Sequence, residues 1–242
     1  MTERPDPTPD RDLKATLRPR NTRVRQGASG EEGNAAAPKS VGRKGFDSDV
    51  AERVIAATIK TLAAHGLEGV KARSVAKDAG IAVGSVYNLF GDLDALLRVA
   101  NGRTYDELHA IEMRALKKAR EDGASPRAQM LALAEAYLEF VANHQRRWLA
   151  TLAFNRRQSD AAPEWYLEKE LALFRIIEEA IADFPGVKEP SQRRRHARAL
   201  WASVHGIVTI AVADSFIMQP LEEVWAEIEI IVNSVAASME AA

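Results

Sequence analysis

The sequence predicts an all-α protein of about nine helices, and three observations lead to this prediction. From Asp47 onward, apolar residues recur at spacings of three and four, which is the period of an amphipathic helix. No segment shows a convincing alternation of apolar and polar residues that would indicate a strand. The boundaries between periodic segments carry helix signals, such as Ser125 as a cap and Pro126 at a first helical position after Gly123. No internal repeat is present.

Residues 1–45 differ in composition from the rest of the chain and are expected to be disordered in isolation. They are rich in proline, glycine and charge, and they have no hydrophobic period. Residues 1–44 hold ten Lys and Arg against six Asp and Glu, and residues 17–25 form an arginine-rich arm. Two interpretations stay open. The segment is an inert leader or a misassigned start, or it is a basic arm that contacts phosphates or a minor groove of DNA.

Residues 46–92 predict a head of three helices. The first begins near Asp47, where N-cap residues cluster, and ends at Gly66. The second spans about residues 72–79 and the third about 83–89. Gly80 can adopt the positive φ that the tight turn between them requires. The small residue Ala76 allows the next helix to cross closely, and Val75, Ile81 and Val86 can form the core that fixes the crossing.

This spacing predicts a helix-turn-helix whose last helix is free to enter a DNA major groove. Ser85 can bond to base edges and Val83 can meet a thymine methyl group. Lys71 and Arg73 lie where a helix N-terminus already favours phosphate. The alternatives are a core role for the Tyr87 ring and a solvated charged face for the two cations. The expected DNA-contacting residues are Arg43, Lys44, Lys71, Arg73, Ala82, Val83, Gly84, Ser85, Tyr87 and Asn88.

Residues 93–242 predict a helical body with two roles, sensing and dimerisation. Asp92 can cap a helix that continues towards Arg120, with a bend at Asn101-Gly102 as an option. Two C-terminal helices, at about 191–216 and after Pro220, carry apolar stripes and many small residues. Two such helices from each subunit would form a four-helix dimer interface. The alternative is that both stripes close the core of a monomer.

Bulky and polarisable residues in the body predict a small-molecule pocket. Trp201 and His205 lie one turn apart on the same face, with His205 as a polar anchor. For any one of these residues the alternative is an ordinary role in the packed core. The expected ligand-binding residues are Tyr137, Phe140, Trp148, Phe154, Trp165, Phe174, Trp201 and His205, with Tyr166 and Met218 as further members.

Composition narrows the class of protein. The 242 residues carry a net charge of −1 and contain no cysteine, which excludes disulfides, thiol catalysis and cysteine-based metal sites and fits a cytoplasmic protein. No secretory signal and no membrane span are visible. The five histidines lack metal-ligand spacing, and there is no phosphate-binding glycine loop or G-x-S-x-G turn. We therefore expect no metal, no cofactor and no enzymatic activity.

The head resembles the tetracycline-repressor (TetR) family of bacterial regulators. The resemblance extends from Gly45 to about Leu97, and a weaker one at Trp201-x-x-x-His205-Gly206 is similar to a C-terminal domain of that family with a Trp-His-Gly signature. One departure is the absence of a cation after Phe90, where relatives often place a lysine. The matching head residues are Val54, Ile55, Gly66, Lys71, Arg73, Val75, Ala76, Gly80, Ile81, Gly84, Val86, Tyr87 and Phe90.

The resemblance implies a homodimeric repressor that binds an inverted-repeat operator in double-stranded DNA and is released by a small-molecule effector. It also implies that Tyr87 and Asn88 contact the sugar-phosphate backbone. Two alternatives remain: a DNA-binding regulator without an effector, and a helical small-molecule-binding protein or enzyme.

Overall fold

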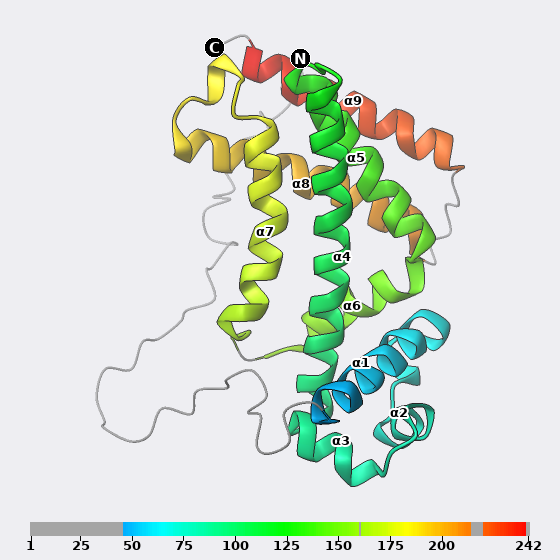
Figure 1. The fold of residues 1–242 in the computed structure, drawn as a ribbon. Helices are drawn as coiled ribbons and strands as arrows, with labels where there is room; N and C mark the ends of the chain where they lie inside the picture. Colours follow the sequence, from blue (N-terminus) through cyan, green and yellow to red (C-terminus); the bar gives the residue numbers. More distant parts are fainter. Residues whose placement is uncertain (1–45, 160, 214–219, 241–242) are drawn as a thin grey trace, which may run out of the picture. The chain divides into compact units, whose positions relative to one another are not determined.

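The computed structural model describes residues 46–159, 161–213 and 220–240 (Figure 1). All regular structure in that part is helical, which confirms the predicted all-α class. The arginine-rich arm, Arg43, Lys44 and Met218 lie outside the described residues. The described helices are α1 (Phe46–His65), η2 (Leu67–Gly69), α2 (Ala72–Ala79), α3 (Val83–Phe90), α4 (Leu93–Glu121), α5 (Pro126–Asn143), α6 (Gln145–Arg157), α7 (Glu164–Ala180), η3 (Pro185–Val187), α8 (Pro190–Val212) and α9 (Leu221–Glu240).

Helices α1, α2 and α3 form the head around a small apolar core. Val54 and Leu62 from α1, Val75 from α2 and Val86 from α3 are completely buried there. Gly80 ends α2 in the left-handed conformation, with φ of 69°, as the sequence predicts. The turn therefore sends α3 across α2 at close range.

Helix α4 connects the head with the body. The Asp92 carboxylate caps it by accepting a hydrogen bond from the Ala95 amide at 2.7 Å. Leu96, Leu97 and Ala100 in its first two turns are buried in the same cluster as the head residues. The helix then continues through the body (Figure 1). The core thus extends past the boundary expected after residue 92.

Asn101-Gly102 does not interrupt α4. Gly102 instead lies where α4 meets α7. A Cβ atom at this position would be 3.2 Å from both the Trp165 ring and the Lys169 side chain. The missing side chain therefore allows the two helices to approach closely at this point.

Helix α6 provides a second attachment between head and body. Ala150 and Phe154 on α6 pack into the head core. The Arg146 guanidinium donates a hydrogen bond to the Ala64 carbonyl oxygen of α1, and Arg157 pairs with Glu68 of η2. These contacts tie the head to α6 as well as to α4.

The rest of the body packs α4, α5, α7, α8 and α9 around one large apolar cluster. Ser125 caps α5 by accepting a hydrogen bond from the Ala128 amide, and Pro126 occupies the first helical position, as predicted. Helix α8 packs against α7 and α9, and α9 also packs against α5.

Candidate nucleic-acid interface and small-molecule cavity

Helix α3 has one buried face and one bare face. Val86 and Phe90 point into the head core. Val83 and Tyr87, which flank this buried stripe, are 36% and 46% exposed. Exposed apolar side chains at these positions contribute little to the fold, so their presence favours contact with another molecule.

The residues around Val83 and Tyr87 complete the bare face. Ala82, Gly84 and Asn88 are exposed, and Ser85 is partly exposed. A Cβ atom added at Gly84 would meet nothing within 4 Å, so the backbone is accessible there. Tyr87 is not part of the head core, which argues against the alternative of a core aromatic. The five α3 residues predicted from the sequence and the N-cap residue Ala82 are therefore all accessible, and we call this surface the α3 face.

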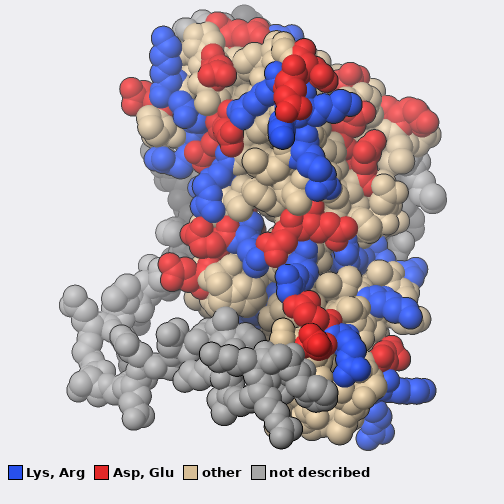
Figure 2. Space-filling view, viewed as in Figure 1, with Lys and Arg blue, Asp and Glu red and all other residues tan. Residues whose placement is uncertain are grey.

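The N-terminus of α2 carries positive charge in the same head. Lys71 is its N-cap residue and Arg73 lies in its first turn, and both are exposed. The first turn holds no acidic residue, and neither cation forms an ion pair among the described residues. Figure 2 shows basic side chains at the lower end of this view, where the head lies. Unpaired cations at a helix N-terminus suit a phosphate group.

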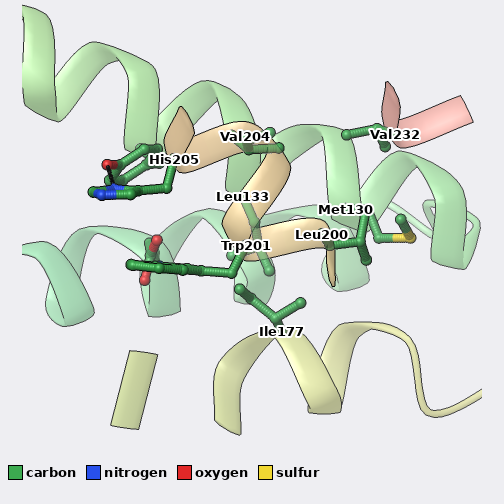
Figure 3. Close-up of a pocket in the computed structure, with 11 residues that line it drawn as sticks. Met130, Leu133, Ile177, Leu200, Trp201, Val204, His205 and Val232 are labelled. Carbon is green, nitrogen blue, oxygen red and sulfur yellow. Dashed lines mark hydrogen bonds between the residues drawn. The ribbon is translucent and has the colours of Figure 1, made fainter. Parts of the chain in front are cut away.

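A cavity lies inside the body between α4, α5, α7, α8 and α9 (Figure 3). The centre of a water-sized sphere fits into only about 40 Å³ of it. The cavity is therefore narrow, and a larger molecule has to widen it. Its lining residues are Glu112, Met130, Leu133, Ala134, Tyr137, Ile177, Leu200, Trp201, Val204, His205 and Val232.

Three of the eight predicted ligand-binding residues line this cavity: Tyr137, Trp201 and His205. Trp148 lies behind them, with its ring edge-on to Tyr137 at a centroid distance of 5.8 Å. Phe140 packs edge-on against Trp148, and Phe174 packs against the Trp201 ring.

The other predicted residues lie elsewhere. Phe154 belongs to the core shared with the head, Trp165 packs on Gly102, and the Tyr166 hydroxyl donates to Asn155 at 2.8 Å. The size of a side chain alone did not distinguish residues of the cavity wall from ordinary core residues. Ligand contact by any of these residues stays a prediction.

His205 is held by two hydrogen bonds within the protein. Its Nδ1 is 2.7 Å from the Tyr137 hydroxyl, and its Nε2 is 3.4 Å from the Thr209 hydroxyl. The Trp201 ring stacks on the imidazole at 4.3 Å with an interplanar angle of 9°. Burial, with a smaller effect from Arg156, lowers the His205 pKa, so the ring is neutral near pH 7. His205 therefore contributes a neutral aromatic wall.

Glu112 is the charged cavity residue that sequence reasoning missed. It is 6% exposed, and its Oε2 atom is buried without a hydrogen-bond partner. Burial raises the pKa of its carboxyl to about 8. The sequence held a signal for it, because Glu112 falls in the helical stripe of Tyr105, Leu108 and Leu116. The other lining residues that the sequence analysis did not predict are Met130 and aliphatic residues. Their sequence pattern is that of ordinary core residues.

A second unpartnered surface lies on the last two helices. Ile210 on α8 and Ile230 on α9 are 62% and 65% exposed, the highest values among the exposed large hydrophobic residues of the described chain. The same two helices carry small residues that are exposed or, for Gly206, partly exposed. We call this surface the α8/α9 face, and its members are Ala199, Ala202, Gly206, Ile210, Ala213, Ala226, Ile230, Ser234 and Ala237.

Within the described ranges, no three His, Asp or Glu side chains gather as a metal site would require. None of the helices described combines the length and apolarity needed to cross a bilayer.

Two family profiles match the chain. Residues 54–100 match the bacterial regulatory proteins of the tetR family, and residues 130–230 match the tetracyclin repressor-like C-terminal domain. The chain is 27% identical over 169 residues to the HTH-type transcriptional regulator BetI of Stenotrophomonas maltophilia. That alignment covers 68% of this chain and 82% of BetI.

Solved structures share the fold. A protein of unknown function from Rhodococcus sp. superposes with a TM-score of 0.62 at 27% identity, covering 78% of this chain and 94% of that one. The transcriptional regulator FadR of Bacillus subtilis, solved in complex with stearoyl-CoA, superposes with a TM-score of 0.54. Its identity is 16% and the match covers 78% of this chain and 96% of FadR, a likeness that concerns the fold alone.

Proposed function

This chain is a DNA-binding transcriptional regulator of the TetR family and not an enzyme, and we propose that it acts in the cytoplasm as a homodimeric repressor released from its operator by a small molecule. The observation that carries the DNA-binding part is the α3 face. Its exposed residues serve no core, and the N-terminus of α2 in the same head carries two exposed cations. An α-helix with accessible N-terminal residues fits a major groove.

Removing the two α2 cations should weaken operator binding without unfolding the protein. We expect the double variant Lys71→Ala, Arg73→Ala to lose affinity about equally for all sequences, because phosphates carry no sequence information. The slope of log affinity against log salt should fall by about two, one for each lost phosphate contact. Tyr87→Ala should also weaken binding. Fluorescence anisotropy on a duplex selected from a random library measures both quantities.

The matched control removes two exposed cations from the body, Arg114→Ala with Lys117→Ala on α4. This variant should bind the selected duplex as the wild type does. If the α2 double variant is folded and keeps both the affinity and the salt slope, the head assignment is wrong.

The dimer part rests on the α8/α9 face. Two exposed isoleucines amid small side chains allow close approach of two helices from a second copy. Two heads related by a two-fold axis would require an inverted repeat with half-sites about one helical turn apart or more.

The effector part rests on the cavity and on α4. Glu112 lines the cavity, and Leu96, Leu97 and Ala100 of the same helix pack in the head core. A molecule that widens the cavity would displace α4 and change the spacing of the two heads. FadR, which shares this fold, was solved with a bound small molecule, stearoyl-CoA.

An effector must bind the free protein more tightly than the operator-bound protein. The coupling acts only through differential affinity for two states, and about 1–3 kcal/mol is typical. We therefore expect a compound that releases the operator to bind about 5- to 150-fold more weakly when operator is present. Titrating the compound by calorimetry with and without saturating operator measures this ratio. Equal affinities for every compound that binds the cavity would favour the effector-independent regulator instead.

A further inference from the structure

Glu112 is a buried carboxyl group with no structural task that the described residues reveal. It lies in the apolar stripe of α4, between Leu108 and Leu116, both of which are 1% exposed. Its Oε2 atom has no hydrogen-bond partner. A buried polar group without a partner destabilises the folded state, and a charged one does so more strongly. A leucine at this position would fill the stripe without that cost.

The surroundings of Glu112 define what it could bind. The cavity lining contains no lysine and no arginine, so nothing there neutralises a carboxylate. The other polar groups facing the cavity are already engaged, since Tyr137 and His205 bond to each other at 2.7 Å. The remaining walls are aliphatic, with the stacked Trp201 and His205 rings on one side (Figure 3). Glu112 is thus the ionisable group with free hydrogen-bonding capacity in a lining that is otherwise mostly apolar.

We propose that the cavity binds an amphipathic amine, whose ammonium group pairs with the Glu112 carboxylate while its apolar body lies among Ile177, Leu200 and Val232. This inference rests on the proposed function, because it names the ligand class of the same cavity. An ammonium supplies both the charge and the hydrogen-bond donors that a carboxylate needs. A carboxylate ligand would lose its hydration in a lining that holds no cation, and an uncharged ligand would leave Glu112 in its protonated form.

The same pairing explains how binding would reach the head. The cavity is too narrow for a molecule of this kind until its walls separate, because a water-sized sphere fits into only about 40 Å³. Glu112 belongs to α4, so an ammonium that pulls on its carboxylate acts directly on the helix that enters the head core. The polar end of the ligand would therefore shift α4 while its apolar end spreads α7, α8 and α9.

Binding should also release a proton. Glu112 from α4 faces Tyr137 from α5 and His205 from α8, whereas α7 and α9 contribute the uncharged Ile177 and Val232. Burial raises the Tyr137 pKa and lowers that of His205, so both stay neutral near pH 7. Glu112 is then the lining group that changes charge, and a bound ammonium converts it from carboxylic acid to carboxylate.

The test compares three probes of one size and shape: 2-phenylethylamine, 2-phenylethanol and phenylacetate. Their affinities for the full-length protein are measured by calorimetry at about pH 7 and about pH 8.5, in two buffers that differ in ionisation enthalpy. We expect the amine to bind about 10- to 100-fold more tightly than the alcohol, the advantage of a charge-assisted hydrogen bond. We expect phenylacetate not to bind. Amine affinity should rise severalfold with pH, and its binding should release close to one proton at the lower pH.

Two variants distinguish the effect of the Glu112 charge from a general disturbance of the fold. Glu112→Gln keeps the shape and should remove the preference for the amine and the proton release, with alcohol affinity within about threefold of wild type. Glu139→Gln, an exposed position on α5, should behave as the wild type. The proposal is overturned if the wild type binds the amine no better than the alcohol, if no probe binds, or if amine binding releases no proton.

Different results would contradict the effector role and the proposed ligand class. An amine that binds with proton release but leaves operator affinity unchanged would contradict the effector role and uphold the ligand class. A neutral probe that releases the operator, where the amine does not, would uphold the effector role and overturn the ligand class.

Discussion

Replacing Ile230 with glutamate is expected to convert the protein to a monomer and to lower operator affinity about 100- to 10,000-fold. Ile230 is 65% exposed on the α8/α9 face, so the substitution leaves the protomer core intact. In a dimer the new carboxylate would be buried against a second copy without a partner, which is costly. Each head would then bind one half-site alone, and the loss equals the avidity that linkage of two heads supplies.

Sedimentation velocity gives the mass of the variant, and anisotropy on the selected operator gives its affinity. Leu171→Glu is the matched control, because Leu171 is 45% exposed on α7 and lies outside the α8/α9 face. Gly206→Phe is a second probe of the same face, where an added Cβ meets nothing within 4 Å in the protomer. If Ile230→Glu and Gly206→Phe both remain dimeric, dimerisation uses another surface.

Replacing Glu112 with glutamine is expected to change how stability depends on pH. In the native state burial raises the carboxyl pKa from 4.5 to about 8. Between these values the folded protein keeps a proton that the unfolded chain has lost, so stability falls as pH rises. The contribution is complete below pH 4.5 and lost above about pH 8, and it amounts to a few kcal/mol, with about 5 kcal/mol as an upper bound. Glutamine does not ionise, so the variant lacks this pH-dependent contribution to stability.

Urea unfolding at about pH 5 and about pH 9 measures the effect, with protein concentration held fixed because dimers gain stability with concentration. Relative to the wild type, Glu112→Gln should gain stability from the lower pH to the higher one. Glu139→Gln, on the exposed side of α5, should track the wild type at both. Parallel curves for wild type and Glu112→Gln would show that the carboxyl ionises freely in the folded protein.

The head was predictable from sequence in detail because its signals are local. Gly80 has the positive φ that the turn requires, Val75 and Val86 form the core, and Asp92 caps α4. Each of these depends on residues within a few positions along the chain. The exposed stripes of α8 and α9 were predictable in outline, since a helix that buries one stripe in its own protomer leaves the opposite one exposed. That these stripes form a dimer interface stays a prediction.

The cavity was not predictable to the same degree because five helices build it. Aromatic bulk identified Tyr137 and Trp201 as wall residues, but it equally selected Phe154, which packs in the head core. Nothing in the sequence tells which of two cores an aromatic joins. Glu112 could have been identified from the sequence, because a charged residue in an otherwise apolar helical stripe contradicts the amphipathic pattern.

The close crossing of α4 and α7 at Gly102 is a point about which α4 can rotate as a rigid rod. Gly102 is ten residues from Glu112 and ten residues from Asp92, which at 1.5 Å per residue gives two arms of about 15 Å. Trp165 and Lys169 hold α4 at this point, 3.2 Å from where a Cβ would be. A rigid helix that pivots there carries the head end as far as the cavity end moves, in the opposite direction. Displacing Glu112 by about 1 Å would therefore swing the start of α4 by about the same amount. In the proposed dimer the two-fold axis would apply the same swing to both heads, so the distance between them would change by up to twice that amount.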